Sequence, residues 1–271
     1  MRYLKALLAS AFLFCTPSPA ATADCTPAAN ATPATLKRII DGDTLLLSDG
    51  RRVRLIGIDT PELSRDNRPA EPLAHQARQA AANFLSDKRL LLMTGVQPHD
   101  RHGRTLAHIF DAEGNSLEAH LLRLGLGFQL SLPPNLDLRD CLRAAEAHAR
   151  QTGMGVWSER YFAPREVSSL HPGDGGFGRY RGTVTRAGRN RSGPFIELDA
   201  TLYLPVSREG LPYFTDWNVN ALLGKAVEVR GWLSYRQLNA SQKARQFRPF
   251  RLYLSHPDNL TPQSTNSVRT P

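Results

Sequence analysis

The sequence predicts a mainly β protein with added helices: a small five-stranded β-barrel that carries three helices, followed by a second small all-β domain. Short apolar or alternating segments, bounded by turn residues, indicate the strands. Three longer segments with helix start and stop signals indicate the helices. A Gly/Pro/Ser-rich stretch at 168–178 separates the two sets of elements, and 41% hydrophobic residues are enough for a core.

The chain opens with the pattern of a secretory signal. Arg2 and Lys5 precede an apolar run from Ala6 to Phe14, and small residues then lead to cleavage after Ala20 or Ala23. We therefore expect residues 1–23 to be removed, which leaves no membrane anchor and a periplasmic or secreted monomer. A retained anchor is the alternative, although the run is short for a bilayer.

The first domain is expected at 36–160, after a flexible Ala/Thr/Pro-rich lead-in at 24–35. Its strands are predicted at Leu36 to Ile40, Thr44 to Leu47, Arg52 to Ile58, Arg89 to Thr94 and Thr105 to Phe110. Its helices are predicted at Glu71 to Leu85, from Asn115 to a stop at Gly125, and from Asp137 to a stop at Gly153.

Beyond a linker at 161–177, the second domain is expected at 178–257, with a flexible tail at 258–271. Strands are predicted at Gly178 to Arg186, Phe195 to Leu204, Val227 to Leu233 and Phe250 to Leu254. They suggest an all-β unit, possibly a barrel of the oligonucleotide-binding (OB) type.

The positive charge is concentrated after position 169. The net charge is +9, and the last 102 residues hold 14 Lys and Arg against 7 Asp and Glu. A basic region attracts polyanions, that is, nucleic acid or anionic lipid. A generally basic, Arg-rich proteome is the simpler alternative.

The residues that could bind a metal or act in catalysis are concentrated around the first predicted hairpin. Asp41-Gly42-Asp43-Thr44 starts one strand, Arg54 lies in the next, and Asp59-Thr60-Pro61-Glu62 follows. A meander can bring these carboxylates to one end of a sheet, where hard oxygen ligands suit Ca²⁺ or Mg²⁺. Arg101 and Arg104 precede a later strand, and arginine forks match phosphate oxygens.

Each of these motifs also has a plain structural interpretation. Asp-Gly pairs are commonly turns, Thr-Pro-Glu is commonly a helix start, and arginines on a hairpin are commonly solvated. The order and spacing of the motifs favour function over these separate interpretations.

The motifs together resemble the staphylococcal-nuclease-like (thermonuclease) family over Leu36 to Ser158. The similar segments are Asp41-Gly42-Asp43-Thr44, Arg54 through Glu62, Asp100 through Ala107, Leu122 through Gly127, Glu146 through Arg150, and Gly155 through Ser158. The resemblance implies an OB-like barrel and Ca²⁺-dependent endonucleolytic cleavage of DNA and RNA, with 3′-phosphate ends.

The resemblance also implies a role for each matching residue. Asp43 and Asp59 would bind the metal with the Thr60 carbonyl, and Asp41 would support them. Glu62 would activate or orient water, while Arg54 and Arg104 would bind the scissile phosphate. The family stacks bases on tyrosines after the second helix; here Phe128 and His102 are possible substitutes, and a buried Phe128 is the alternative.

Further nucleic-acid contacts are predicted at basic residues beside aromatic ones, a pattern suited to single strands; these residues are Arg101, His102, Arg179, Arg181, Arg245 and Arg248. Two cysteines remain after export, and we expect a Cys25–Cys141 disulfide, with two free thiols as the alternative.

Two rival functions stay open. One is a nucleic-acid-binding envelope protein whose nuclease site is weak or silent, and the other is an envelope protein whose basic domain binds anionic lipid or glycan.

Overall fold

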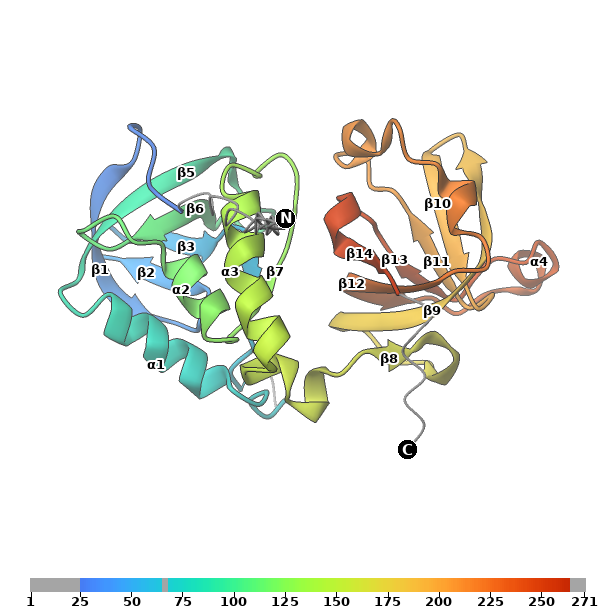
Figure 1. Cartoon of the computed structure of the whole chain (residues 1–271), viewed down its shortest axis with the longest axis horizontal. Coiled ribbons are helices and arrows are strands. Elements are labelled where there is room, and N and C mark those ends of the chain that lie inside the picture. Colours follow the sequence, from blue (N-terminus) through green and yellow to red (C-terminus); the bar gives the residue numbers. More distant parts are fainter. Residues whose placement is uncertain (1–24, 65–67, 264–271) are drawn as a thin grey trace, which may run out of the picture.

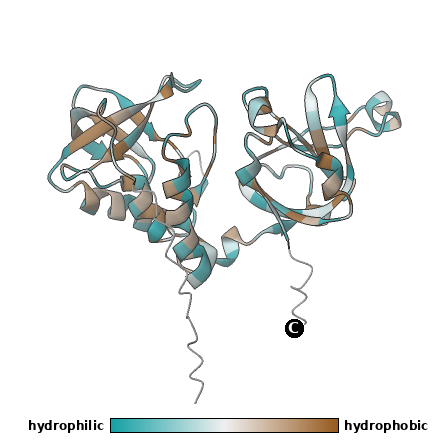
Figure 2. Cartoon of the chain, turned by 45° about the horizontal axis from the view of Figure 1, so that its top comes forward, coloured by the Kyte–Doolittle hydropathy of each residue, from teal (hydrophilic) through white to brown (hydrophobic). Residues whose placement is uncertain are grey.

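The computed structural model describes residues 25–64 and 68–263, and the predicted signal lies outside them. Two β-barrels lie side by side, joined by a connection below them (Figure 1). Hydrophilic and hydrophobic residues are interspersed in both units (Figure 2). Among the described residues, no helix has both the length and the apolar character needed to cross a membrane.

The first barrel is closed, with strand order β1-β2-β3-β6-β5, and only the β3–β6 pairing is parallel. This confirms the predicted five-stranded barrel. The strands are β1 (Thr32–Ile39), β2 (Thr44–Leu47), β3 (Arg52–Leu55), β5 (Arg89–His99) and β6 (Thr105–Phe110). Outside the barrel, β4 (Ile58–Asp59) pairs with β7 (Phe128–Gln129).

Three helices cover this barrel: α1 (Ala74–Phe84), α2 (Leu117–Arg123) and α3 (Arg139–Thr152). Each buries one apolar face at helical spacing, as Leu142, Ala145 and Ala149 do in α3. Gly153 ends α3 in the left-handed conformation that glycine adopts without strain.

The second barrel repeats the strand order of the first. Its closed ring is β9-β10-β11-β13-β12, and the β11–β13 pairing is the parallel one. The strands are β9 (Gly176–Asn190), β10 (Gly193–Leu198), β11 (Leu202–Pro205), β12 (Ala226–Tyr235) and β13 (Phe250–Leu252). Edge strands β8 (Arg165–Glu166) and β14 (Leu260–Pro262) pair with β9 and β12, and α4 (Ala240–Ala244) lies between β12 and β13.

Several boundaries differ from the sequence prediction. β1 begins at Thr32, inside the expected lead-in, because residues 32–35 pair with β5. β8 and the start of β9 lie within the predicted linker, and β14 lies within the predicted tail. In each case a short polar or Pro-containing segment gains backbone partners from a strand that is distant in the sequence.

Two predicted strands are broken by residues with positive φ. The strand expected at 52–58 ends at Leu55, because Gly57 (φ 78°) turns the chain before β4. The strand expected at 195–204 is a hairpin, because Asp199 (φ 46°) and Ala200 (φ 52°) form a tight turn. The Thr201 N–H donates to the Leu198 carbonyl across that turn at 2.9 Å.

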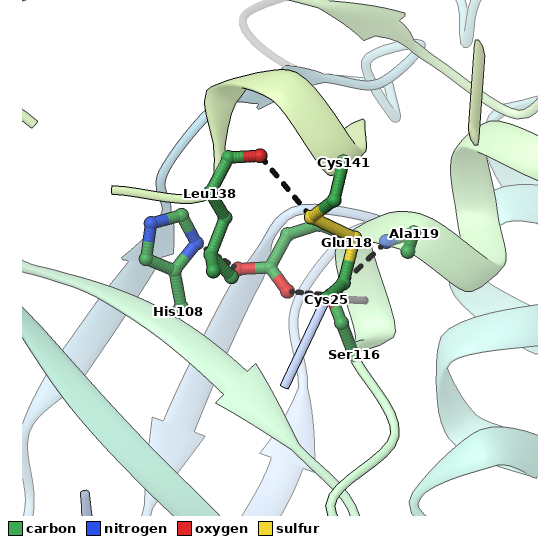
Figure 3. Close-up of a disulfide and its surroundings, with 7 residues drawn as sticks. All are labelled: Cys25, His108, Ser116, Glu118, Ala119, Leu138 and Cys141. Carbon is green, nitrogen blue, oxygen red and sulfur yellow. Dashed lines mark hydrogen bonds and ion pairs between the residues drawn. A yellow bond between two sulfur atoms is a disulfide. The ribbon is translucent and has the colours of Figure 1, made fainter. Parts of the chain in front are cut away.

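A disulfide joins Cys25 to Cys141 across 116 residues, the pair expected from the sequence. It ties the segment before β1 to the first turn of α3, and both half-cystines are buried (Figure 3). Beside it, the buried Glu118 carboxylate accepts from the Ser116 hydroxyl at 2.9 Å and lies 3.1 Å from His108 Nδ1. The lead-in is therefore fixed at both of its ends.

The two barrels contact each other through α3 and β7 of the first (Figure 1). Arg230 of β12 makes a two-pronged ion pair with Glu146 of α3, at 2.6 and 2.9 Å, and also donates to the Gln129 carbonyl. Asp258 of the second domain lies 3.3 Å from the Arg143 guanidinium, and Asn259 bonds the Ser131 backbone. Charged and polar groups thus form part of the interface.

Candidate active site

The centre of the site is one guanidinium nitrogen shared by two carboxylates. Arg54 Nη2 lies 2.7 Å from Asp59 Oδ1 and 3.1 Å from Asp43 Oδ2. Arg54 Nη1 donates to the carbonyls of Leu55 and Ile58, at 2.9 and 2.7 Å. All three charged side chains are largely buried, so their positions are fixed.

The β2–β3 hairpin and the turn after β3 produce this convergence. Thr44 pairs with Arg54 across the hairpin, and the Leu55 N–H donates to the Asp43 carbonyl. The Thr60 N–H donates to Asp43 Oδ2 at 2.9 Å, which joins the second carboxylate motif to the first. Gly42 is required here because a Cβ would lie 2.6 Å from the Thr60 hydroxyl.

The site holds an excess of negative charge. Burial raises the pKa of Asp59 to about 8 although Arg54 opposes this, and the charges of Asp43 and Glu62 raise it further. Burial and the Asp43 charge raise the pKa of Asp41 to about 7. Repulsion of this kind favours a bound cation.

Glu62 is exposed beside this pair and is tied to a residue that sequence analysis missed, Glu71. The Glu62 N–H donates to Glu71 Oε2 and the Glu71 N–H donates to the Glu62 carbonyl, both at 2.9 Å. The hydroxyl of Tyr161, a residue that is 59% exposed, donates to Glu71 Oε1 at 3.2 Å. No local motif marked Glu71 or Tyr161. Glu71 contacts Glu62 from the other side of a loop, and Tyr161 contacts Glu71 from the connection between the domains.

The second arginine motif forms the β5–β6 turn. Asp100 accepts from the Arg104 side chain at 2.7 Å, and from the N–H groups of His102 and Arg104 at 2.9 Å each. Arg104 immediately precedes β6, the parallel neighbour of the strand that carries Arg54. Arg101 and His102 are exposed and bond each other at 3.0 Å.

The predicted basic contacts of the second domain fall into two groups. Arg179 is largely buried, pairs with Glu228 at 2.8 Å and lies 4.6 Å from the Trp157 ring centre, so the structure places it in the interface between the domains. Arg181 also faces Glu228, at 3.6 Å. Arg245 is exposed beside Phe247, while Arg248 bonds Glu197 at 2.7 Å.

Phe128 is 3% exposed and packs against Trp157, Phe162 and Phe177. The interface between the barrels therefore occupies it, and it cannot stack on a base. Of the two substitutes considered from the sequence, His102 is the exposed one.

The donor set suits a hard divalent cation, although no group of three or more Asp, Glu, His or Cys residues within 25–64 and 68–263 is arranged to hold a metal. Asp43 and Asp59 present oxygens to one common point, the position of Arg54 Nη2. Carboxylate and carbonyl oxygens are the ligands of Ca²⁺ and Mg²⁺. A cation of this kind would relieve the repulsion between the two buried carboxylates of Asp43 and Asp59.

Comparisons with known proteins identify the family of the first domain. Residues 52–159 match the family model for staphylococcal nuclease homologues. The chain is 34% identical to a thermonuclease of Staphylococcus intermedius over 125 residues, which cover 45% of this chain and 74% of the relative. It is 31% identical to a thermonuclease of Staphylococcus hyicus over 45% of this chain and 73% of the relative. It is 30% identical to endonuclease YncB of Bacillus subtilis over 46% of this chain and 61% of the relative. The chain therefore belongs to the staphylococcal nuclease family and is a nuclease, which is a hydrolase.

Proposed function

We propose that the protein is an exported, Ca²⁺-dependent endonuclease that hydrolyses phosphodiester bonds of DNA and RNA. The observation that carries the proposal is the convergence of Asp43 and Asp59 on one nitrogen of Arg54. An ion pair with Arg54 uses one carboxylate, and the second buried carboxylate beside the exposed Glu62 supports the proposal of a cation site next to a base.

Each residue has a distinct role in this proposal. Asp43, Asp59 and the Thr60 carbonyl would hold Ca²⁺, with Asp41 behind them. The ion would supply positive charge to the phosphate oxygens. Glu62 accepts a proton from the attacking water, and Arg54 and Arg104 bind phosphate and stabilise its developing charge. The bond to the 5′ oxygen breaks, which leaves a 3′-phosphate.

Two features support export. Residues 1–23 have the pattern of a secretory signal. The disulfide between Cys25 and Cys141 requires an oxidising compartment to persist. Protein from the periplasm or medium should carry no alkylatable thiol at either position, and two alkylated cysteines in non-reduced protein would contradict export with this bridge.

The deciding experiment is degradation of plasmid DNA and of an unstructured RNA in Ca²⁺, Mg²⁺ or EDTA. We expect cleavage of both in Ca²⁺ and none in EDTA. Asp59→Asn should abolish cleavage, and the exposed turn residue Asp49 gives the matched control Asp49→Asn. Undiminished cleavage in EDTA would disprove the metal role, and binding without cleavage would favour the rival of a silent nucleic-acid-binding protein.

A further inference from the structure

The second barrel carries an outward face on which arginine and tyrosine side chains contact each other. Leu202 and Leu204 of β11, Leu252 of β13 and Leu254 just after it point into the core, and the alternate residues point outward. Tyr203 pairs with Arg251 across the two strands, and Tyr253 follows two residues later. We call Tyr203, Arg251 and Tyr253 the aromatic–arginine face.

The contacts within this face hold its rings in place. The Arg251 guanidinium carbon lies 5.7 Å from the ring centres of both Tyr203 and Tyr253, and Nη1 donates to the Tyr253 hydroxyl at 3.2 Å. Asn190 donates to the Tyr203 hydroxyl at 3.0 Å. Tyr253 remains 53% exposed although its hydroxyl and its ring both contact Arg251. A fixed, exposed ring is available to stack with a planar ligand.

Further positive charge borders this face on β9 and on the loop from β12 to β13. Arg186 and Arg248 both reach the buried Glu197 carboxylate, at 3.4 and 2.7 Å, and Arg186 also lies 5.5 Å from the Phe195 ring centre. Exposed Arg245 lies over Phe247 in the same loop. One carboxylate therefore faces several arginines, and the surface has a net positive charge.

Tyr203 lies on the third strand of this barrel, and Arg251 pairs with it from the fifth strand, so the face adjoins the region where barrels of this strand order bind oligomers. Such barrels use the second and third strands, with the loops after the first and fourth. Here those elements are β10, β11, the turn at Arg191 and Ser192, and the loop that contains α4. Figure 1 shows α4 at the edge of the second barrel that is farthest from the first. The contacts of Tyr203, Arg251 and Tyr253 described above stay within the second barrel, whereas Arg179 pairs with Glu228 and faces Trp157 of the first domain.

We propose that the aromatic–arginine face binds single-stranded nucleic acid, with bases stacked on Tyr253 and Tyr203 and phosphate paired with Arg251. Bases in a duplex are already stacked, so only an unpaired strand can use both the rings and the charge. The inference concerns binding and does not rest on the nuclease proposal.

The test measures binding of a fluorescein-labelled oligo-dT and of a duplex of the same length to the full chain in EDTA, which separates binding from cleavage. Tyr253→Ala should weaken single-strand binding about fivefold or more, the scale of one lost stack, with a smaller effect on duplex. Arg251→Gln should also lower the slope of log affinity against log salt by about one.

Two controls keep the result interpretable. Tyr253→Phe keeps the ring and loses only the hydrogen bond to Arg251, so it should bind much more tightly than Tyr253→Ala, and Arg89→Gln removes an exposed charge from β5 of the first barrel. Thermal unfolding checks that every variant is folded. Wild-type single-strand binding by both test variants would overturn the proposal. An equal loss on duplex, or an equal loss in Tyr253→Phe, would also overturn it.

Discussion

At the scale of residues, local spacing was enough to predict the carboxylate site, because all of its members lie on one hairpin and the turn that follows. Asp43, Arg54 and Asp59 meet as expected within 17 positions. The role of Arg179 could not be read in this way, since its partner Glu228 lies 49 positions away on β12. Charge identity is visible in a sequence, but charge pairing depends on the fold.

The proposed acid–base and phosphate roles predict losses of rate without loss of the fold. Glu62→Gln and Arg104→Ala should each lower the cleavage rate about 10²-fold or more, the scale for a positioned base or a charge-stabilising donor. Arg54→Ala should lower the rate by a similar factor. It should also lower the stability of the fold, because the buried Asp43 and Asp59 carboxylates would lose their shared partner.

Single-turnover cleavage of plasmid in Ca²⁺ measures these losses. Glu113→Gln, at an exposed turn, is the matched control for Glu62→Gln. A folded Arg104→Ala variant that cleaves at the wild-type rate would remove Arg104 from the phosphate site.

At the scale of elements, the sequence predicts long apolar segments well and tight turns poorly. The turn between β10 and β11 was missed because its two central residues are Asp199 and Ala200, and Ala is not a usual turn residue with positive φ. The Thr183 N–H donates to Asp199 Oδ1 at 3.0 Å, so a neighbouring strand stabilises this turn. That contact depends on tertiary structure and leaves no local signal.

This turn predicts a stabilising substitution. Ala200 has φ 52°, where a Cβ costs roughly 1 kcal/mol and glycine has no such cost. Ala200→Gly should therefore raise the free energy of unfolding by up to about 0.5 kcal/mol, because the greater chain entropy of glycine offsets part of the gain.

The same change in a helix should have the opposite sign. Ala80→Gly in α1 should lower stability by about 0.5–1 kcal/mol. Urea unfolding of both variants measures the pair, and a destabilised Ala200→Gly would show that the turn is not strained.

At the scale of the whole molecule, the second barrel contacts the strand that supports the active site. Asp59 pairs through its backbone with Phe128, and the next residue, Gln129, donates to Glu146 at 2.6 Å. Glu146 in turn binds Arg230. A chain of polar contacts thus links β12 to a proposed metal ligand, and no sequence pattern indicates it because its members lie 84 and 101 positions apart.

Removing Arg230 tests whether the second barrel supports the nuclease site. The Arg230 and Glu146 side chains are 11% and 5% exposed, so Arg230→Ala leaves a carboxylate buried without its cation. Breaking a pair of this kind costs roughly 3–5 kcal/mol. Because Glu146 also holds Gln129, cleavage should fall together with stability.

Arg143→Ala is the matched control across the same interface, since Arg143 is 49% exposed and its pair with Asp258 contributes about 0–1 kcal/mol. Thermal unfolding and the cleavage rate of a short oligonucleotide are measured for both variants. Equal effects of the two substitutions would mean that the buried pair does not support the site, and that the two barrels act independently in cleavage.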